Sequence, residues 1–209
     1  IAKGESFGLV GNNGAGKTTF YRMILDLIRP THGTVLSKGI DVRTTEEWKF
    51  YTGSFLDESF LIDYLTPDEY FEFVGSLHNY SPGDMKEFLG QFEVLFNGEI
   101  TGKKKYIRDL SKGNQKKVGI AAALMGSPEV ILLDEPFANL DPTTQIRLKD
   151  LLRDLKEKYQ LTMLISSHDL NHVTEVCERI VLLEKGEVKQ DIKTSASTLK
   201  DLEEYFATY

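Results

Sequence analysis

The chain has 209 residues, of which 41% are hydrophobic, 11% aromatic and 27% charged, values typical of a folded globular protein of one domain or of one domain with an insertion. This composition excludes a disordered chain and a collagen-like repeat, and the single cysteine, Cys177, excludes a disulfide-rich scaffold and favours a reducing, cytosolic compartment. The net charge of −7 disfavours nucleic acid as a partner, because proteins that bind nucleic acid through its phosphates usually have a basic surface.

The first part of the chain alternates short apolar runs with helical patterns. A strand is predicted at 6–10, where it leads into a glycine-rich turn, and a helix is predicted at 17–28, which Pro30 stops. Weaker strand patterns occupy 34–36 and 54–56.

Aromatic residues gather in the next part of the chain. Thirteen of the 22 aromatic residues lie between Trp48 and Phe96, and the patterns that begin at Pro67 and Pro82 predict helices. We interpret this stretch as a helical insertion. The favoured explanation is that a small helical unit needs large side chains to fill its core; the alternative is an exposed docking surface.

The second half of the chain returns to strand patterns. The continuous apolar runs at 130–133 and 161–165 predict strands buried on both faces of a parallel sheet, and a strongly periodic helix at 143–159 precedes the second run. A hairpin is predicted with strands at 179–184 and 187–192, and a terminal helix is predicted at 197–209. Strands that alternate with helices in this order predict an α/β domain.

The glycine-rich turn contains a phosphate-binding motif. The pattern G-x-x-x-x-G-K-[ST], the Walker A motif, is matched by Gly11-Asn12-Asn13-Gly14-Ala15-Gly16-Lys17-Thr18. The glycines let the backbone wrap around phosphate oxygens, and the N-terminus of the following helix favours an anion. Lys17 adds a positive charge at the β- and γ-phosphates, and Thr18 offers a hydroxyl group to Mg²⁺. The motif therefore predicts a nucleotide-phosphate site.

Two carboxylates follow the apolar run at 130–133. Asp134 and Glu135 stand at its C-terminal end, which is the edge where open α/β sheets bind ligands. We expect Asp134 to hold Mg²⁺, directly or through water, and Glu135 to orient or deprotonate an attacking water.

Three further segments narrow the class of protein. They are Leu110-Ser111-Lys112-Gly113-Asn114-Gln115, Pro136-Phe137-Ala138-Asn139-Leu140-Asp141 and Ser166-Ser167-His168-Asp169. With the two motifs above, in this order and spacing, they resemble the ATP-binding-cassette (ABC) family over essentially the whole chain. The resemblance identifies 11–19 as the Walker A motif and 110–114 as the signature. It identifies 132–135 as the end of the Walker B strand, 139–141 as the D-loop and His168 as the switch histidine.

The resemblance implies an α/β fold of the P-loop NTPase, ABC ATPase type, with a mainly parallel core sheet flanked by helices and an inserted helical subdomain. The core is expected at 1–57 and 127–209, and the helical subdomain with the signature at 58–126. The family's opening strands and the aromatic residue that stacks on adenine lie upstream of Walker A, so we expect both to be missing from this chain.

The resemblance also assigns roles to individual residues. The catalytic residues are expected to be Glu135, His168 and Lys17. ATP is expected to contact Gly11, Asn12, Asn13, Gly14, Ala15, Gly16, Lys17, Thr18, Thr19, Ser111, Gly113 and Asp141. Mg²⁺ is expected at Thr18, Asp134 and Asp57.

The signature is expected to act on the ATP of a second subunit. Ser111 is a favourable helix N-cap and Gly113 permits close backbone approach, so together they make a helix N-terminus suited to an anion. In the family the signature contacts the γ-phosphate of ATP bound by a partner. This implies a second ATP-binding subunit, in a homo- or heterodimer that closes on two ATP molecules and opens after hydrolysis.

Two sites depart from the family pattern. Asp57 stands where Gln is usual; its carboxylate can still reach Mg²⁺ or a water on it, but when ionised it cannot donate a hydrogen bond. The usual signature L-S-G-G-Q has Lys112 in place of its first Gly and Asn114 in place of its Gln. We expect function to be retained, because Ser111 and Gly113 remain.

The favoured function is ATP hydrolysis that powers a separate membrane permease, because the apolar runs are far shorter than the ~20 residues of a membrane span. The protein is then expected in the cytoplasm, at the inner face of the cell membrane, with the permease in contact with Phe55, Phe60, Leu61 and Tyr64. The sequence is most similar in style to ABC-2-type exporter subunits. Two alternatives stay open: a soluble ABC ATPase, and a regulatory module that hydrolyses ATP poorly because of Asp57 and Lys112.

Overall fold

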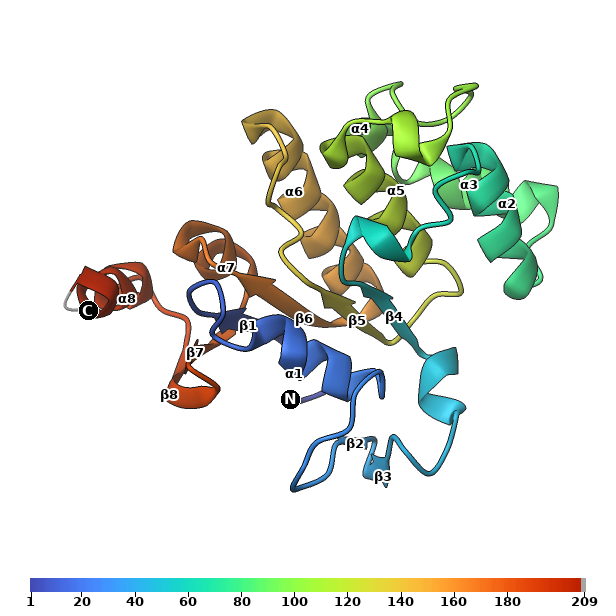
Figure 1. The fold of residues 1–209 in the computed structure, drawn as a ribbon. Helices are drawn as coiled ribbons and strands as arrows, with labels where there is room; N and C mark the ends of the chain where they lie inside the picture. The colour runs from blue at the N-terminus through green and yellow to red at the C-terminus, as the bar shows by residue number, and fades with distance from the viewer. Residues whose placement is uncertain (208–209) are drawn as a thin grey trace.

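The computed structural model describes residues 1–207 and has a six-stranded sheet at its centre (Figure 1). The strand order is β4-β5-β6-β1-β7-β8, and neighbouring strands are parallel except for the antiparallel pair β7 and β8. The bounds are Ser6–Val10 for β1, Thr52–Phe55 for β4, Val130–Leu133 for β5, Thr162–Ser167 for β6, Arg179–Glu184 for β7 and Glu187–Lys193 for β8. The predicted mainly parallel sheet is therefore confirmed.

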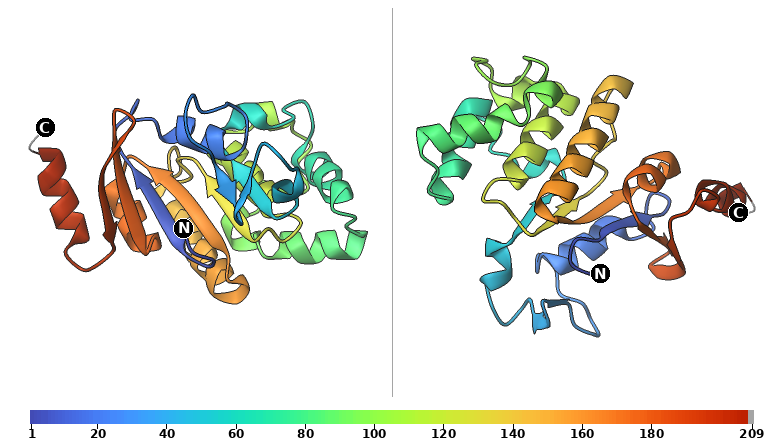
Figure 2. Two further views of the ribbon diagram at one scale, coloured as in Figure 1. Left: turned by 90° about the horizontal axis from the view of Figure 1, so that it is seen from below. Right: turned by 180° about the vertical axis from the view of Figure 1, so that it is seen from behind.

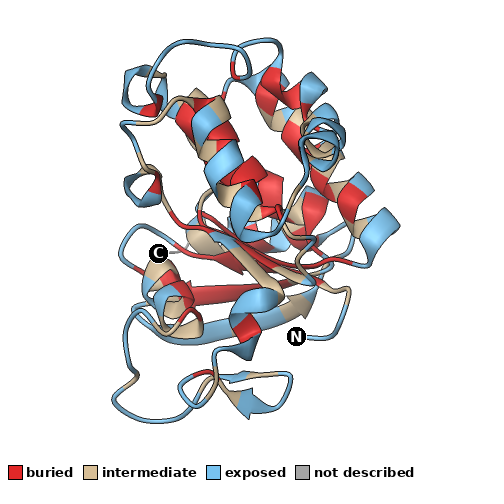
Figure 3. Cartoon of the chain, turned by 90° about the vertical axis from the view of Figure 1, so that its right-hand side faces the viewer, coloured by how far each residue is buried: buried red, intermediate tan, exposed pale blue. Residues whose placement is uncertain are grey.

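Helices cover both faces of this sheet. Helix α1 (Lys17–Ile24) lies on one face, whereas α6 (Pro142–Tyr159) and α7 (Leu170–Val176) lie on the other (Figure 1 and Figure 2). Alternate strand residues serve the two faces: Leu132 packs in the cluster of α1, whereas Ile131 and Leu133 pack in the cluster of α6. Figure 3 shows the strands largely buried and the outer helix faces exposed.

The ends of several predicted elements need correction. The helix predicted at 17–28 ends at Ile24, because Asp26 takes a left-handed backbone with φ of 51°. The strand predicted at 34–36 is instead a short hairpin of β2 (Leu36–Ser37) and β3 (Ile40–Asp41). The strand predicted at 54–56 begins two residues earlier, at Thr52.

The C-terminal hairpin is confirmed. Lys185 and Gly186 join β7 to β8 with φ of 50° and 82°, the positive values that a two-residue turn requires. The terminal helix α8 covers Thr198–Ala207, and the last two residues of the predicted helix at 197–209 lie outside the described residues. In the part of the chain that the structure describes, every helix is too short or too polar to cross a membrane.

The segment between β4 and β5 is helical, as predicted. Its α-helices are α2 (Pro67–Leu77), α3 (Pro82–Gly90), α4 (Glu93–Phe96) and α5 (Lys112–Ala123). Capping boxes start α2 and α3, in which Thr66 pairs with Glu69 and Ser81 with Asp84. This segment also contains the short 3₁₀ turns η2 (Glu58–Phe60) and η3 (Ile107–Asp109), whereas a third, η1 (Glu47–Phe50), precedes β4. The division into a core and a subdomain at 58–126 stays a prediction.

The aromatic residues of this segment are divided between the core and the surface. Phe92 and Phe96 are buried and stack with ring centroids 5.6 Å apart, and the same core cluster continues into the central sheet. Phe60 and Tyr64, in contrast, are 52% and 64% exposed. Packing accounts for the first pair but not for the second.

Candidate nucleotide-binding and catalytic site

The phosphate loop lies between the end of β1 and the start of α1. Gly14 and Gly16 have φ of 83° and 109°, left-handed values that favour glycine. Gly16 is also the N-cap of α1, where no side chain binds the first N–H groups, so these donors face a hollow of about 200 Å³. Residues 13–19 and Glu135 line the hollow. The loop therefore has the geometry of an anion site.

Lys17 is held at the centre of this loop. Its side chain is 6% exposed, and Nζ donates a hydrogen bond to the carbonyl oxygen of Gly11 at 2.6 Å. The ammonium also lies 3.3 Å from Oε1 of Glu135. A buried cation that is fixed beside an anion site can neutralise phosphate charge without reorganisation.

Oxygen donors suited to Mg²⁺ meet beside Lys17. The hydroxyl of Thr18 donates to Oδ2 of Asp134 at 2.5 Å, and the hydroxyl of Ser166 donates to Oδ1 of the same carboxylate. Hydroxyl and carboxylate oxygens are ligands that Mg²⁺ prefers. Thr18 and Asp134 thus fit the metal role predicted for them. The hydrogen bond from Ser166 orients the carboxylate of Asp134.

Glu135 lies between the predicted phosphate ligands. Its Oε2 is 2.9 Å from Nδ1 of His168, and its buried Oε1 lies 3.3 Å from Lys17 Nζ and has no hydrogen-bond partner among the described residues. Glu135 is thus within contact distance of the other two residues predicted to be catalytic. A carboxylate held by an imidazole beside a phosphate site has the geometry of a general base.

The signature and the D-loop form a second hollow, of about 400 Å³, that shares no lining residue with the first among the described residues. Ser111 caps α5, as predicted, by accepting a hydrogen bond from the N–H of Asn114. A Cβ atom at Gly113 would lie only 3.0 Å from the carbonyl oxygen of Asn139. Asp141 caps α6, and the hydrogen bonds from the hydroxyl and N–H of Thr144 lower the pKa of its carboxyl.

Asp57 follows β4 and caps the 3₁₀ turn η2. Its carboxylate accepts a hydrogen bond from the N–H of Ser59 at 2.7 Å and caps η2, and Asp57 is not among the residues that line the hollow. The described residues contain no cluster of three His, Cys, Asp or Glu side chains able to hold a metal ion. The metal role of Asp57 stays a prediction.

Two residues at the site were missed by the sequence reasoning. Ser166 accepts a hydrogen bond from the N–H of Glu135 at 2.9 Å, and Lys116 donates one to the carbonyl oxygen of Glu135 at 2.7 Å. A signal existed for Ser166, because it lies at the C-terminal end of β6, next to β5, the strand that Asp134 follows. The signal for Lys116 was its spacing, because Lys116 and Ile120, four residues apart, share one face of α5.

These features define the class of protein. A parallel strand, a glycine-rich loop, a helix N-terminus and a carboxylate pair at the same C-terminal edge of the sheet make a P-loop nucleotide-binding fold. A family model described as "ABC transporter" matches residues 1–138. The chain therefore belongs to the ABC transporter family, and the predicted membership is confirmed.

Individual relatives agree with the family. An uncharacterized ABC transporter ATP-binding protein of Synechocystis is 36% identical over 191 residues, which is 90% of this chain and 53% of that protein. The ABC transporter ATP-binding protein NatA of Bacillus subtilis is 35% identical over 190 residues, 90% of this chain and 76% of NatA. The chain spans little more than half the length of several relatives that it matches. The ABC-2-type subclass stays a prediction.

A solved structure supports the predicted fold class. The dimeric, post-hydrolysis structure of the ATP-binding cassette MJ0796 bound to ADP and Pi superposes with a TM-score of 0.81. The two sequences are 29% identical, and the aligned residues cover 94% of this chain and 88% of MJ0796. The expected ABC ATPase fold is therefore confirmed.

Proposed function

We propose that the chain binds ATP with Mg²⁺ and hydrolyses the bond to the γ-phosphate. The observation that carries this proposal is the Glu135 carboxylate, held between the Lys17 ammonium and the His168 imidazole at the mouth of the phosphate loop. Bound Mg²⁺, held by Thr18 and Asp134, would neutralise charge on the β- and γ-phosphates.

The proposed reaction needs a general base and positively charged or N–H groups around the phosphate oxygens. Glu135 accepts a proton from water as the water oxygen bonds to the γ-phosphorus, and the bond to the β-phosphate oxygen breaks to give ADP and phosphate. Lys17 and the N–H groups of the loop stabilise the charge on the phosphate oxygens. His168 holds Glu135 in place and contacts the γ-phosphate.

The proposal includes a second ATP-binding subunit. The signature hollow and the phosphate hollow share no lining residue among the described residues, which supports a signature that acts on the γ-phosphate of another chain. The similar cassette MJ0796 is dimeric with ADP and Pi bound. A symmetric dimer in which each signature faces the other chain's phosphate loop would complete two sites at once.

Phosphate release from ATP by the full-length protein, measured alone and with its permease, tests the proposed activity. We expect release that requires Mg²⁺ and rises with the permease. Binding of ATP without release under both conditions would contradict the proposed hydrolysis and favour a regulatory module.

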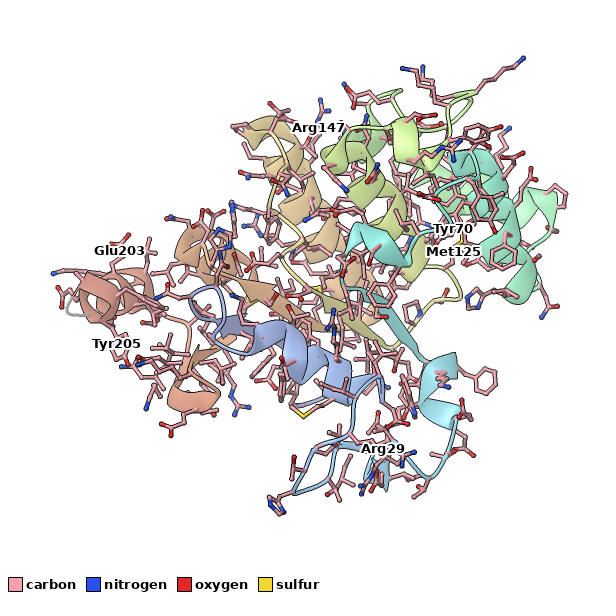
Figure 4. All side chains as sticks on the ribbon, viewed as in Figure 1. Arg29, Tyr70, Met125, Arg147, Glu203 and Tyr205 are labelled. Carbon is pink, nitrogen blue, oxygen red and sulfur yellow. The ribbon has the colours of Figure 1, made fainter. Side chains whose placement is uncertain are left out.

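A separate permease at the inner face of the cell membrane is the second proposed partner. A hollow of about 460 Å³ lies between η1, β4, η2, α2 and α5, and its lining includes the predicted contact residues Phe55, Phe60 and Leu61. Tyr70, labelled in Figure 4, lines it from α2. Phe55 and Leu61 line the hollow but are buried by packing, whereas Tyr64 is exposed but does not line it, and the contact set stays a prediction.

Phe60 is the best-placed docking side chain, because it is both exposed and part of this hollow. We expect Phe60→Ala to weaken binding to the permease at least ~10-fold, as loss of a buried aromatic anchor does. ATP binding by the free protein should be unchanged. Pull-down of the permease measures this, with Ile146→Ala as the control, since Ile146 is equally exposed on α6. Equal binding by both variants would remove Phe60 from the interface.

A further inference from the structure

Lys116 is a buried cation that the proposed reaction does not use. Lys116 lies in the first half of helix α5, and only 4% of the residue is exposed. Its Nζ donates a hydrogen bond to the main-chain carbonyl oxygen of Glu135 at 2.7 Å and lies 3.9 Å from Oε1 of Glu58. Burial lowers the pKa of Lys116, and the nearby carboxylates of Glu58, Glu135 and Asp134 act against that shift.

The residue that Lys116 contacts has an unfavourable backbone. Glu135 has φ of 49°, in the left-handed region that residues with a side chain rarely adopt. Such a conformation persists only where surrounding contacts hold it. Ser166 accepts the N–H of Glu135, and the carbonyl oxygen accepts from Lys116 and, at 3.3 Å, from the N–H of Ala138. Lys116 provides the shortest of these bonds.

Helix α5 is anchored by residues other than Lys116. The amide of Gln115 donates to the carbonyl oxygens of Ile107 and Leu110, and the ammonium of Lys117 donates to Glu99. Ser111 caps the same helix. These contacts fasten the start of α5 on either side of Lys116, whereas Lys116 itself binds the backbone that carries the proposed base.

We infer that Lys116 is a positioning residue that fixes the left-handed backbone of Glu135, so that the carboxylate stays between Lys17 and His168. The inference rests on the proposed role of Glu135 as the base. Through this hydrogen bond, α5, which begins with the signature, acts directly on the backbone of the catalytic residue. Movement of the signature helix and the position of the base are therefore coupled within one chain.

Lys116→Met removes the donor but keeps an unbranched apolar stem in the buried site. We expect kcat to fall roughly 10- to 100-fold, the cost of misplacing a catalytic group by about an ångström, with KM for ATP changed less than about twofold. Lys149→Met is the matched control, because Lys149 is also buried and pairs with Glu175 on the far side of the sheet from α1. We expect it to leave kcat unchanged, and the melting temperature of both variants is measured alongside.

The decisive measurement repeats Lys116→Met in a Glu135→Gln background, by single-turnover hydrolysis. If Lys116 acts through Glu135, the substitution has less than about a twofold effect once the base is gone. An equal loss in both backgrounds, or a loss seen only in KM or in the melting temperature, overturns the inference. If Glu135→Gln alone keeps wild-type turnover, the proposed base itself is wrong, and this result is distinct from the others. If Lys116→Met does not fold, Lys116→Gln is measured in the same two backgrounds with the same criteria.

Discussion

Glu135→Gln is expected to lower kcat for ATP hydrolysis by at least ~100-fold, within the range that general-base catalysis contributes. The amide has the shape of the carboxylate and can still face His168 at 2.9 Å, but it cannot accept the proton of the attacking water. ATP binding should be kept or become tighter, because the substitution removes a negative charge 3.3 Å from Lys17. The variant should therefore accumulate in an ATP-bound dimer, which size-exclusion chromatography with radiolabelled ATP detects.

Glu129→Gln is the matched control for this variant. Glu129 directly precedes β5, at the opposite end of the strand from Glu135, and its carboxylate is partly exposed and pairs with Lys38. The control removes one negative charge from the same strand without touching the phosphate loop, so turnover should match the wild type. Near wild-type turnover of Glu135→Gln, or an equal loss in both variants, would contradict the assignment of Glu135 as the base.

The sheet and the phosphate loop were predictable because their signals are local. The run at 130–133 is apolar over the whole strand, the run at 179–184 is apolar at its four central residues, and the structure gives both strands the predicted bounds. The loop at 11–18 carries its conformation in its glycines. The end of α1 was not predictable in the same way. Asp26 is compatible with a helix, and only the left-handed backbone that it adopts ends the helix before Pro30.

The contacts of the site are not local, and the sequence gives little warning of them. Ser166 reaches Asp134 from 32 residues away, and Lys116 reaches the backbone of Glu135 across the boundary between helix and sheet. A lysine in a helix pattern is normally assigned to solvent, because a buried charge is costly unless it is paired. Phe55 is buried whereas Phe60 is exposed, and residue type does not distinguish them; the ring of Phe55 lies against Gly119 of α5, a contact that is distant in the sequence.

Mixing two inactive variants is expected to restore activity if two copies of this chain form the dimer. Lys17→Ala removes the buried cation of the phosphate loop, so each phosphate site in that variant loses its main positive charge. Gly113→Asp places a carboxylate in the signature hollow, and its Cβ atom would crowd the carbonyl oxygen of Asn139. Each variant alone should lose at least ~100-fold in kcat, because every composite site contains one defect.

A one-to-one mixture places both defects of a mixed dimer in one site and leaves the other site intact. With random exchange of subunits, half of the dimers are mixed, so about a quarter of wild-type turnover should return. A mixture that stays as inactive as its components, although size-exclusion chromatography shows mixed dimers with ATP, would contradict a site shared between chains. A mixture without mixed dimers would contradict the homodimer and point to a different chain as the second ATP-binding subunit. Restored turnover has only one source in this design, a phosphate loop of one chain closed by the signature of another.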